Sequence, residues 1–372
     1  MTNAQKLAPP LLYSPTDSRY LESDRAFQGC PTVAVTRGGR IFLGWYSGGI
    51  REPHIDNYNL VVYSDDGGKS WTKPYLVIPG SRELGIHSLD IQLWCAPSGA
   101  LHVFWVQNHA VPTTDGIRPP LPESYPWISV DGYDFGDFEH SMWMTVCADP
   151  DADRPVFDEP RRVDKGFLRC KPTALPDGRY LFFNYDQLSD RYGYSVSCDG
   201  GLSFSHRYGA IKLDTPFDEA MAYVREDGSI RMLARTNGRY GYLAESTSAD
   251  GGESWSEAVL SNIKNPGSRF YISRLPSGRL LLVNNDSSET RTNMALCLSE
   301  DDGVSWKYIR VIDTREQLSY PDCDRLGDRI YLTYDRERTG AREILFLDFT
   351  EEDIMNPDHA FDIRVVSKPR II

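Results

Sequence analysis

Short apolar segments joined by brief polar turns run along the whole chain. Six of these segments begin a repeated pattern of strand, turn ending in glycine, and second strand, which predicts a β-hairpin. The predicted strands are residues 30–35 and 42–45, 91–94 and 103–105, 171–175 and 181–183, 221–224 and 230–233, 270–272 and 280–283, and 330–334 after the last turn. The turn glycines are Gly39, Gly99, Gly178, Gly228, Gly278 and Gly327.

A second motif, Ser-x-Asp-x-Gly-x-Ser-Trp, occurs between the hairpins. Its copies are residues 64–71, 248–255 and 299–306, with a copy ending in Phe at residues 197–204. Asp and Gly favour turns, and four copies in the same register indicate a structural repeat. We expect the Asp to cap backbone N–H groups, a Gly to adopt positive φ, and the aromatic ring to enter the core. Trp71, Trp255 and Trp306 are therefore predicted to be buried.

The spacing of the hairpins predicts the fold class. Successive turn glycines are 60, 79, 50, 50 and 49 residues apart, and a period near 50 residues with four strands per unit is typical of a β-propeller blade. The prediction is an all-β chain, residues 1–372, that forms one six-bladed propeller domain. We expect strands at residues 11–13 and 362–366 to pair and close the ring, and a short helix at residues 351–354.

The second spacing is long because of an insertion at about residues 108–140. It is rich in Pro, Tyr and Trp, and its aromatic residues Tyr125, Trp127, Tyr133 and Phe135 are unfavourable in water. A loop of this length in a compact domain is usually functional or disordered. We expect it to lie over the site as a lid or rim.

Composition excludes several classes of protein. The net charge of −13 and the scattered basic residues argue against a nucleic-acid groove. No stretch approaches 18 apolar residues and the first residues have no apolar signal region, so we expect a cytoplasmic protein without a membrane segment. The seven Cys, without CxxC spacing, predict buried free thiols. No metal or cofactor is predicted.

Charged residues cluster at one kind of position, just before the first strand or just after the second strand of each hairpin. In a propeller these positions converge on one concave site. The residues there are Arg51, Glu52, His54, Asp56, His87, Asp90, Arg169, Lys171, Asp218, Glu219, Arg235, Arg239, Arg269, Arg291, Tyr320, Asp322 and Asp335. Each single residue is also compatible with an ordinary surface or structural role.

With these motifs the chain resembles the sialidase superfamily, six-bladed propellers whose repeated turns are called Asp-boxes. The resemblance covers nearly the whole chain. It implies that Glu219, which opens the fourth blade, and Arg235, which ends that hairpin, are site residues. It further implies that Arg291, before the last Asp-box, binds substrate and that Tyr320 is the nucleophile.

One position departs from this family. Sialidases begin the first blade with an arginine that helps to bind the substrate carboxylate, and Gly29 stands at the equivalent place here. Arg235 and Arg291 remain as a pair that can bind an anionic group. For the general acid, Asp56 is the nearest match to the family's aspartate, and His54 is an alternative. Arg51, Arg169, Lys171, His87, Asp90 and Arg269 are further candidates for substrate binding.

The resemblance implies an exo-acting glycoside hydrolase that cleaves a terminal, anionic sugar from an oligosaccharide or glycoconjugate with retention. Tyr320 would act as nucleophile with Glu219 as its base, an exception to the usual pair of carboxylates. Two alternatives stay open. One is a lyase acting on an uronic acid linkage, with His54, His87 or Tyr320 as the base; the other is a non-catalytic carbohydrate-binding propeller.

Overall fold

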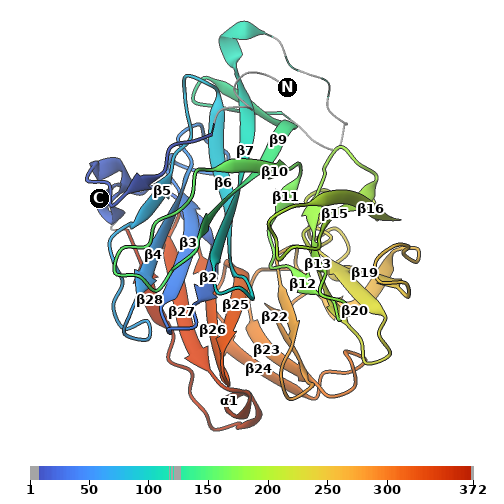
Figure 1. Cartoon of the computed structure of the whole chain (residues 1–372). Helices are drawn as coiled ribbons and strands as arrows, with labels where there is room; N and C mark the ends of the chain where they lie inside the picture. Colours follow the sequence, from blue (N-terminus) through green and yellow to red (C-terminus); the bar gives the residue numbers. More distant parts are fainter. Residues whose placement is uncertain (1–7, 117, 119, 121–126, 370–372) are drawn as a thin grey trace. The chain divides into compact units, whose positions relative to one another are not determined.

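The computed structural model describes residues 8–116, 118, 120 and 127–369, without the side chains of residues 137–139. The chain divides into two compact units, each described by itself below. Unit 1 comprises Met1–Leu168, Asp335–Phe346 and Val365–Ile372, and unit 2 comprises Arg169–Tyr334 and Leu347–Arg364. Almost all regular structure is antiparallel β-sheet (Figure 1).

Unit 1 contains the first two sheets. The first has the order β1 (Leu12–Tyr13), β5 (Leu76–Ile78), β4 (Tyr58–Ser64), β3 (Ile41–Ser47) and β2 (Gln28–Val35). The second has the order β10 (Arg161–Asp164), β9 (Tyr133–Cys147), β7 (Leu101–Pro112) and β6 (Ile86–Cys95), with β8 (Ile128–Val130) paired to β9. The short 3-10 helices are η2 (Ser18–Tyr20), η3 (Glu22–Asp24) and η4 (Thr113–Asp115), and β11 is Phe167–Leu168.

Unit 2 contains three four-stranded sheets. They are β12 (Thr173–Ala174), β13 (Tyr180–Phe182), β15 (Arg191–Ser197) and β16 (Ser205–Ile211); β17 (Ala220–Val224), β18 (Ile230–Ala234), β19 (Tyr242–Ser248) and β20 (Val259–Lys264); and β21 (Tyr271–Arg274), β22 (Leu280–Asn285), β23 (Met294–Ser299) and β24 (Tyr308–Asp313). The short strand β14 is Asn184–Tyr185.

The residues of the sixth sheet are divided between the two units. Its order is β25 (Leu318–Leu326), β26 (Arg329–Arg336), β27 (Glu343–Phe349) and β28 (Arg364–Ser367). Helix α1 (Glu351–Met355) follows β27, as predicted, and Thr350 closes a capping box with Asp353 at its start.

The six predicted hairpins are confirmed as two neighbouring strands at one end of each of the six sheets. Their turn glycines all have positive φ, between 62° at Gly327 and 97° at Gly99. The fold class is therefore the predicted all-β, six-bladed propeller, with mostly four antiparallel strands in each blade. That the chain behaves as one domain stays a prediction.

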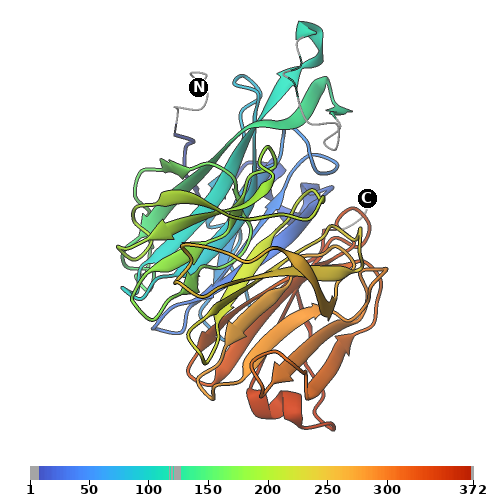
Figure 2. The same ribbon diagram turned by 90° about the vertical axis from the view of Figure 1, so that its right-hand side faces the viewer.

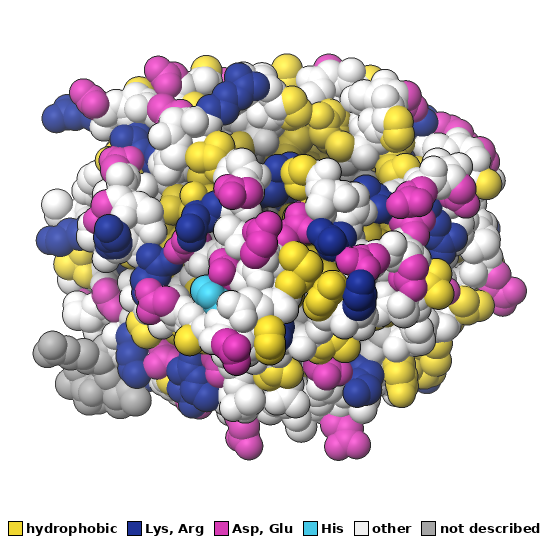
Figure 3. All heavy atoms as spheres, turned by 90° about the horizontal axis from the view of Figure 1, so that it is seen from below, with side chains coloured by type: hydrophobic (Ala, Val, Ile, Leu, Met, Phe, Trp, Pro, Cys, Tyr) yellow, Lys and Arg dark blue, Asp and Glu magenta, His cyan; other side chains and the backbone are white. Residues whose placement is uncertain are grey.

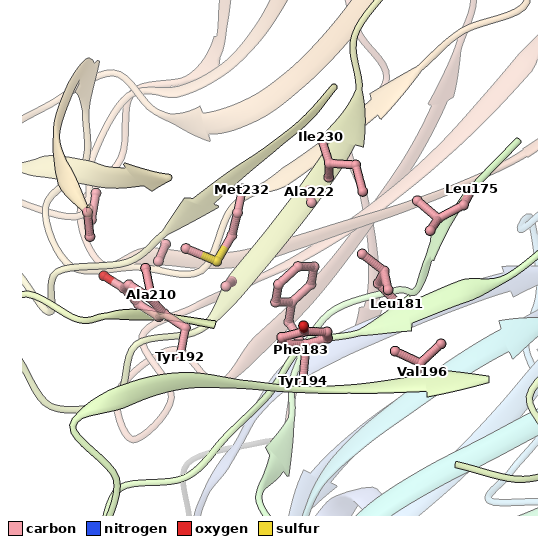
Figure 4. Packing of buried hydrophobic residues seen from close by; sticks show 14 residues of the cluster. Leu175, Leu181, Phe183, Tyr192, Tyr194, Val196, Ala210, Ala222, Ile230 and Met232 are labelled. Atoms are coloured by element: carbon pink, nitrogen blue, oxygen red, sulfur yellow. The ribbon is translucent and has the colours of Figure 1, made fainter. Parts of the chain in front are cut away.

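Apolar side chains of neighbouring sheets form the core. In unit 2 the first and second sheets contribute Phe183, Tyr192, Tyr194 and Met232 to one cluster of buried residues. Figure 4 shows these side chains between the strands that carry them. In unit 1 a corresponding cluster includes Trp105. Strands β2, β3, β18 and β22 are buried at every position, so both of their faces are packed.

The four repeated turns have the predicted hydrogen bonds. In the turn of residues 248–255, Asp250 Oδ1 accepts the N–H groups of Glu253 at 3.0 Å and Ser254 at 2.9 Å. Gly252 has a φ of 92°. The side-chain hydrogen bond from Ser254, followed by its N–H, lowers the pKa of Asp250 to about 2. The carboxylate of Asp250 therefore stabilises the turn by binding its main-chain N–H groups.

The predicted burial of the turn aromatics is wrong. Trp71, Trp255 and Trp306 are only partly buried. The ring of Trp71 packs edge-on against Phe346 at 5.2 Å between centroids, and Trp255 packs in the same way against Tyr194 at 5.9 Å. Trp255 packs against the buried cluster of its unit but keeps part of its surface accessible, because the neighbouring residues of its turn are exposed.

The predicted pairing of the two terminal segments is also wrong. Strand β1 pairs with β5, with Leu12 opposite Val77. Strand β28 is instead the outer strand of the sixth sheet, next to β27. Each terminal strand therefore completes the edge of a different blade.

The insertion forms a β-hairpin instead of an irregular loop. Strand β7 continues to Pro112, β9 begins at Tyr133, and β8 adds a third strand. In Figure 2 this hairpin extends beyond the other strands of its sheet. Phe135 is buried with Ile55 and Ala110, while Trp127 and Tyr133 are partly buried. Tyr125 lies outside the described residues.

Figure 3 shows positive and negative side chains interspersed over the face seen there.

Within the described residues, no helix has the length and apolar character needed to cross a membrane.

All seven cysteines have free thiols. Five are buried, as predicted, but Cys95 is half-buried and Cys198 is exposed.

Candidate active site

Several first strands of the hairpins are irregular near their beginning. Cys30 in β2, Asp90 in β6 and Tyr320 in β25 have positive φ values of 56°, 60° and 57°. At Cys30 and Asp90 the strand pairing also shifts register, as in a β-bulge. Bulges change the direction of side chains and are frequent beside active sites. Two of these three residues, Asp90 and Tyr320, are among the predicted site residues.

Tyr320 and Glu219 form a buried hydrogen bond in unit 2. The phenol Oη of Tyr320 donates to Glu219 Oε1 at 2.5 Å, and the exposed fractions of these residues are 2% and 0%. The contact that the sequence predicted between these two residues is confirmed. It joins side chains 101 positions apart in the chain.

The pairing of β17 with β18 brings Arg235 to the same pair. Ala220 lies opposite Ala234, and the N–H of Arg235 donates to the carbonyl of Glu219 at 2.9 Å. Arg235 Nη1 lies 2.9 Å from Glu219 Oε1 and donates to Tyr320 Oη at 2.7 Å. The three polar groups therefore form one closed triangle.

Four arginines surround the ring of Tyr320. Their Cζ atoms lie 5.1–5.8 Å from the ring centroid; they are Arg169, Arg235, Arg269 and Arg291. Arg169 Nε also lies 3.2 Å from Glu219 Oε1. Four predicted site arginines are thus brought together around one phenol.

The charges of this cluster shift the titration of its members. Burial alone would raise the pKa of Glu219, but Arg235, Arg169 and the hydrogen bond from Tyr320 outweigh it and lower that pKa to about 2. The pKa of Arg235 is raised by Glu219 and Tyr320 against the effect of burial. At neutral pH the cluster contains a carboxylate and guanidinium groups.

Two other predicted residues of unit 2 make ordinary protein contacts as well. Lys171 Nζ pairs with Asp322 Oδ2 at 2.9 Å in a buried ion pair. Arg291, which is half-buried, donates to the carbonyl of Gly267 at 2.7 Å and to Ser319 Oγ at 3.1 Å. The positive charge of Lys171 is neutralised by the carboxylate of Asp322, so this pair adds no net charge to the cluster.

The candidate acid groups lie in unit 1. His54 Nδ1 is 3.7 Å from Asp56 Oδ2, and His54 Nε2 is 3.7 Å from Asp131 Oδ2. Arg82 binds Asp56 with two hydrogen bonds of 2.6 Å and reaches Asp131 Oδ2 at 2.7 Å. Asp131 has a φ of 49° and precedes Gly132, in the turn between β8 and β9. The insertion therefore contributes a carboxylate to the group around His54.

The hydrogen bonds of His54 indicate its tautomer. The N–H of Asp56 donates to His54 Nδ1 at 3.2 Å, so the proton of a neutral ring belongs on Nε2. Burial lowers the pKa of His54, and Arg82 adds to this effect, while Asp56 and Asp131 oppose it. His54 is therefore neutral at pH 7. Its Nε2–H faces the carboxylate of Asp131.

His54, Asp56 and Asp131 are close enough together to ligate one metal ion. The guanidinium of Arg82, however, already contacts both carboxylates at 2.6–2.7 Å. A cation would have to displace Arg82 to bind there. The geometry fits an internal charge pair better than a metal centre.

The remaining predicted residues of unit 1 differ in exposure. Arg51 is exposed, whereas Asp90 and His87 are buried. The ring of His87 packs edge-on against Phe135 at 5.0 Å, and burial lowers the pKa of His87 to about 3. Within the described part of the chain, neither ring nitrogen of His87 has a hydrogen-bond partner. Its surroundings are those of a core histidine.

At Gly29 the structure gives a local reason for the departure from the family. A Cβ atom at this position would lie 2.7 Å from Cγ and Cδ of Arg338. Arg338 Nε binds Asp335 Oδ2 at 3.1 Å and its Nη1 binds Glu52 Oε2 at 3.2 Å. The space beside Gly29 is therefore filled by an arginine from a distant part of the sequence.

Unit 1 also contains a surface cavity of about 570 Å³ beside Asp56 and Arg82. Residues from η2 and from the segments around β4 line it, among them Tyr20, Tyr58, Asp56 and Arg82. Arg82 and Asp131 were not among the predicted site residues. The sequence Asp131-Gly132 is typical of a turn, but it does not show which residues the turn contacts in the folded chain.

The predicted site residues thus fall into two groups. Tyr320, Glu219, Arg169, Lys171, Arg235, Arg269 and Arg291 belong to unit 2, and Arg51, His54, Asp56, His87 and Asp90 belong to unit 1. The expected convergence of all of them on one site stays a prediction.

The sequence is similar to a known protein family and to a curated sialidase. A family model described as a BNR repeat-like domain matches residues 39–332. A sialidase from Micromonospora viridifaciens is 26% identical over 360 residues, which cover 87% of this chain and 53% of that protein. The chain therefore spans about half the length of this curated relative.

Solved structures with low identity share the fold. The NanB sialidase from Streptococcus pneumoniae has a TM-score of 0.67 at 17% identity, covering 94% of this chain and 71% of that chain. A protein of unknown function from Dyadobacter fermentans has a TM-score of 0.65 at 17% identity, covering 98% of this chain and 99% of that chain. At such identities the likeness concerns the fold alone.

Proposed function

Because the chain belongs to the BNR repeat-like domain family of sialidase-superfamily propellers, we propose that it is an exo-acting glycoside hydrolase that removes a terminal anionic sugar with retention. The observation that carries the proposal is the buried hydrogen bond between Tyr320 and Glu219 inside a group of four arginines. The sialidase from Micromonospora viridifaciens supports the choice of substrate class.

The charge of the cluster favours an anionic substrate. Among the described residues, four guanidiniums lie around the ring of Tyr320, and those of Arg169 and Arg235 form ion pairs with the carboxylate of Glu219. Arginine binds carboxylates through two parallel hydrogen bonds, and a buried site strengthens that attraction. A sugar that carries a carboxylate can form such pairs with these guanidiniums, whereas a neutral sugar cannot.

In the first step, Tyr320 Oη attacks the anomeric carbon of the terminal sugar. The bond from this carbon to the leaving oxygen breaks, and the phenolic proton passes to Glu219 along their 2.5 Å hydrogen bond. Glu219 is a weak base at rest, because its pKa is lowered to about 2. The proton therefore moves as the new carbon–oxygen bond forms, while Arg235 stabilises the charge that develops on the phenol oxygen.

The leaving oxygen needs a proton, for which Asp56 and His54 remain the candidates. Asp56 is held by Arg82 in a bidentate pair, and His54 carries its proton on Nε2. In the second step the deprotonated acid removes a proton from water, which attacks the anomeric carbon. The bond to Tyr320 then breaks, and Tyr320 recovers its proton from Glu219.

A panel of oligosaccharides with terminal anionic residues tests the proposal when the products are identified by mass. We expect a released anionic monosaccharide, heavier by one water than the residue in the chain. A product with a new C=C bond, recognised by its absorbance, supports the lyase alternative. Binding without any product supports the non-catalytic alternative.

A further inference from the structure

Tyr320 has a main-chain conformation that few tyrosines adopt. Its φ of 57° lies in the left-handed region, which is unfavourable for a residue with a bulky side chain. Such conformations persist only where the surrounding structure fixes them. The groups that fix Tyr320 therefore determine where its phenol lies.

Two consecutive residues bind both polar main-chain groups of Tyr320. The N–H of Tyr320 donates to Ser268 Oγ at 3.2 Å, and Arg269 Nη2 donates to the carbonyl of Tyr320 at 3.1 Å. Ser268 is completely buried, and the exposed fraction of Arg269 is 2%. Arg269 Nη1 also donates to the carbonyl of Arg169 at 2.6 Å. Arg269 is thus engaged with main-chain carbonyls, although we predicted it from the sequence as a substrate ligand.

The segment that carries Ser268 is itself fixed by buried hydrogen bonds. Asn265 Oδ1 accepts the N–H groups of Gly267 at 2.8 Å and Ser268 at 3.1 Å, and Asn265 Nδ2 donates to the carbonyl of Ser268 at 2.9 Å. Arg291 joins the carbonyl of Gly267 to Ser319 Oγ. The turn before β21 and the beginning of β25 are therefore connected at several points.

We propose that Ser268 and Arg269 are positioning residues, which hold the left-handed backbone of Tyr320 so that its phenol meets Glu219 and Arg235. This inference rests on the proposed role of Tyr320 as nucleophile. A displacement of about 1 Å at a reacting group costs on the order of 10²-fold in rate. Loss of either contact therefore lowers the rate of the chemical step more than it weakens substrate binding.

The variant Ser268→Ala tests the proposal with the least disturbance, because it removes one oxygen atom and leaves the N–H of Tyr320 without its acceptor. A fluorogenic aryl sialoside serves as the probe substrate. We expect kcat to fall about tenfold, equivalent to about 1.4 kcal/mol, with KM within about twofold of the parent value. Arg269→Lys, which keeps the charge but has a single donor group, should retain more activity than Arg269→Met.

Ser246→Ala is a matched control in the same unit. Ser246 is also buried, with an exposed fraction of 2%, and its hydroxyl donates to the carbonyl of Ser256 at 2.8 Å, far from Tyr320 in the sequence. It should lower the melting temperature to a similar extent and leave kcat unchanged. A Ser268→Ala protein with the parent kcat, or a fall in kcat equal to that of Ser246→Ala, overturns the proposal.

A second measurement separates this proposal from the proposed function. The ring signal of Tyr320 in ¹³C-tyrosine-labelled protein can be assigned from Tyr320→Phe. We expect this signal to move in Ser268→Ala and to stay in place in Ser246→Ala. If it moves although the parent cleaves neither the probe nor any oligosaccharide with a terminal anionic residue, the positioning role stands and the hydrolase function fails. If it does not move, the positioning role fails.

Discussion

Glu219 and Arg235 lie opposite each other at the end of the β17–β18 hairpin, and both contact the phenol of Tyr320. Cross-strand neighbours face the same side of a sheet, so the register of one hairpin determines the geometry of this group. The base and the cation that serve the phenol are therefore positioned by local β-structure, whereas the phenol comes from a strand about a hundred residues away.

The variant Tyr320→Phe tests the nucleophile. It keeps the ring among the four arginines and removes the oxygen that would form the covalent bond, so we expect turnover to fall on the order of 10³-fold or more. The melting temperature should change little, since Glu219 keeps its contacts with Arg235 and Arg169. Trapping with a fluorinated substrate analogue and mapping the labelled peptide provides the direct measurement. A label on a carboxylate residue contradicts the mechanism.

Acid stability tests the charge state of Glu219. Its pKa is lowered in the folded protein from 4.5 to about 2. This contribution to stability is therefore fully present above about pH 4.5 and is lost as the pH falls through 2. The variant Glu219→Gln leaves buried arginines without their carboxylate, which costs about 3–5 kcal/mol near neutral pH.

Urea unfolding of parent and Glu219→Gln at pH 7, 5, 4 and 3 provides the measurement. We expect the difference in unfolding free energy to be constant from pH 7 to 5 and to shrink below that. A difference that stays the same down to pH 3 would mean that Glu219 is not held as an anion by its arginines. The variant Glu257→Gln changes an exposed carboxylate in the same unit and serves as a control.

The repeated turns should act on stability and not on chemistry. Trp255 is half-buried against Phe183 and Tyr194, so Trp255→Ala should cost about 3 kcal/mol or less, at the lower end of the range for buried tryptophans. Activity per folded molecule should equal that of the parent. Thermal denaturation and an assay well below the melting temperature check both points. An inactive variant with the parent melting temperature would show that the turns belong to the site.

The sequence was sufficient for the features that depend on neighbouring residues. The six hairpins, the glycine turns and the caps at Asp250 and its equivalents follow from patterns of a few residues, and the structure confirms them. The degree of burial of Trp255 depends on how far its turn projects from the blade. A pattern of a few residues does not predict this distance. For the same reason the pairing partner of β1 was predicted incorrectly.

The candidate site was predictable in part. The resemblance to sialidases indicated Tyr320 and Glu219, because the residues stand at matching places along the chain. It could not indicate Ser268, whose hydroxyl accepts a main-chain N–H from 52 positions away. It could not indicate Arg82 or Asp131 either, since the insertion brings Asp131 to His54 only through its own hairpin.

The variant Asp131→Asn tests whether the insertion controls the proton of His54. The carboxylate of Asp131 raises the pKa of His54, against the larger effect of burial. Removing this charge, while Arg82 keeps its own, should therefore lower that pKa further. The titration is measured on the ring protons of His54 by NMR, with the signal assigned from His54→Gln.

Asp134→Asn is the matched control, because Asp134 lies on the same insertion and pairs with Arg118 instead. We expect the pKa of His54 in this variant to equal that of the parent. If His54 transfers the proton to the leaving oxygen, the limb of the pH–rate profile that reports it should shift to lower pH in Asp131→Asn by the same amount as the NMR titration. A profile that does not move while the titration does would assign the transfer to Asp56. A titration unchanged in both variants would mean that Asp131 does not face His54 in solution.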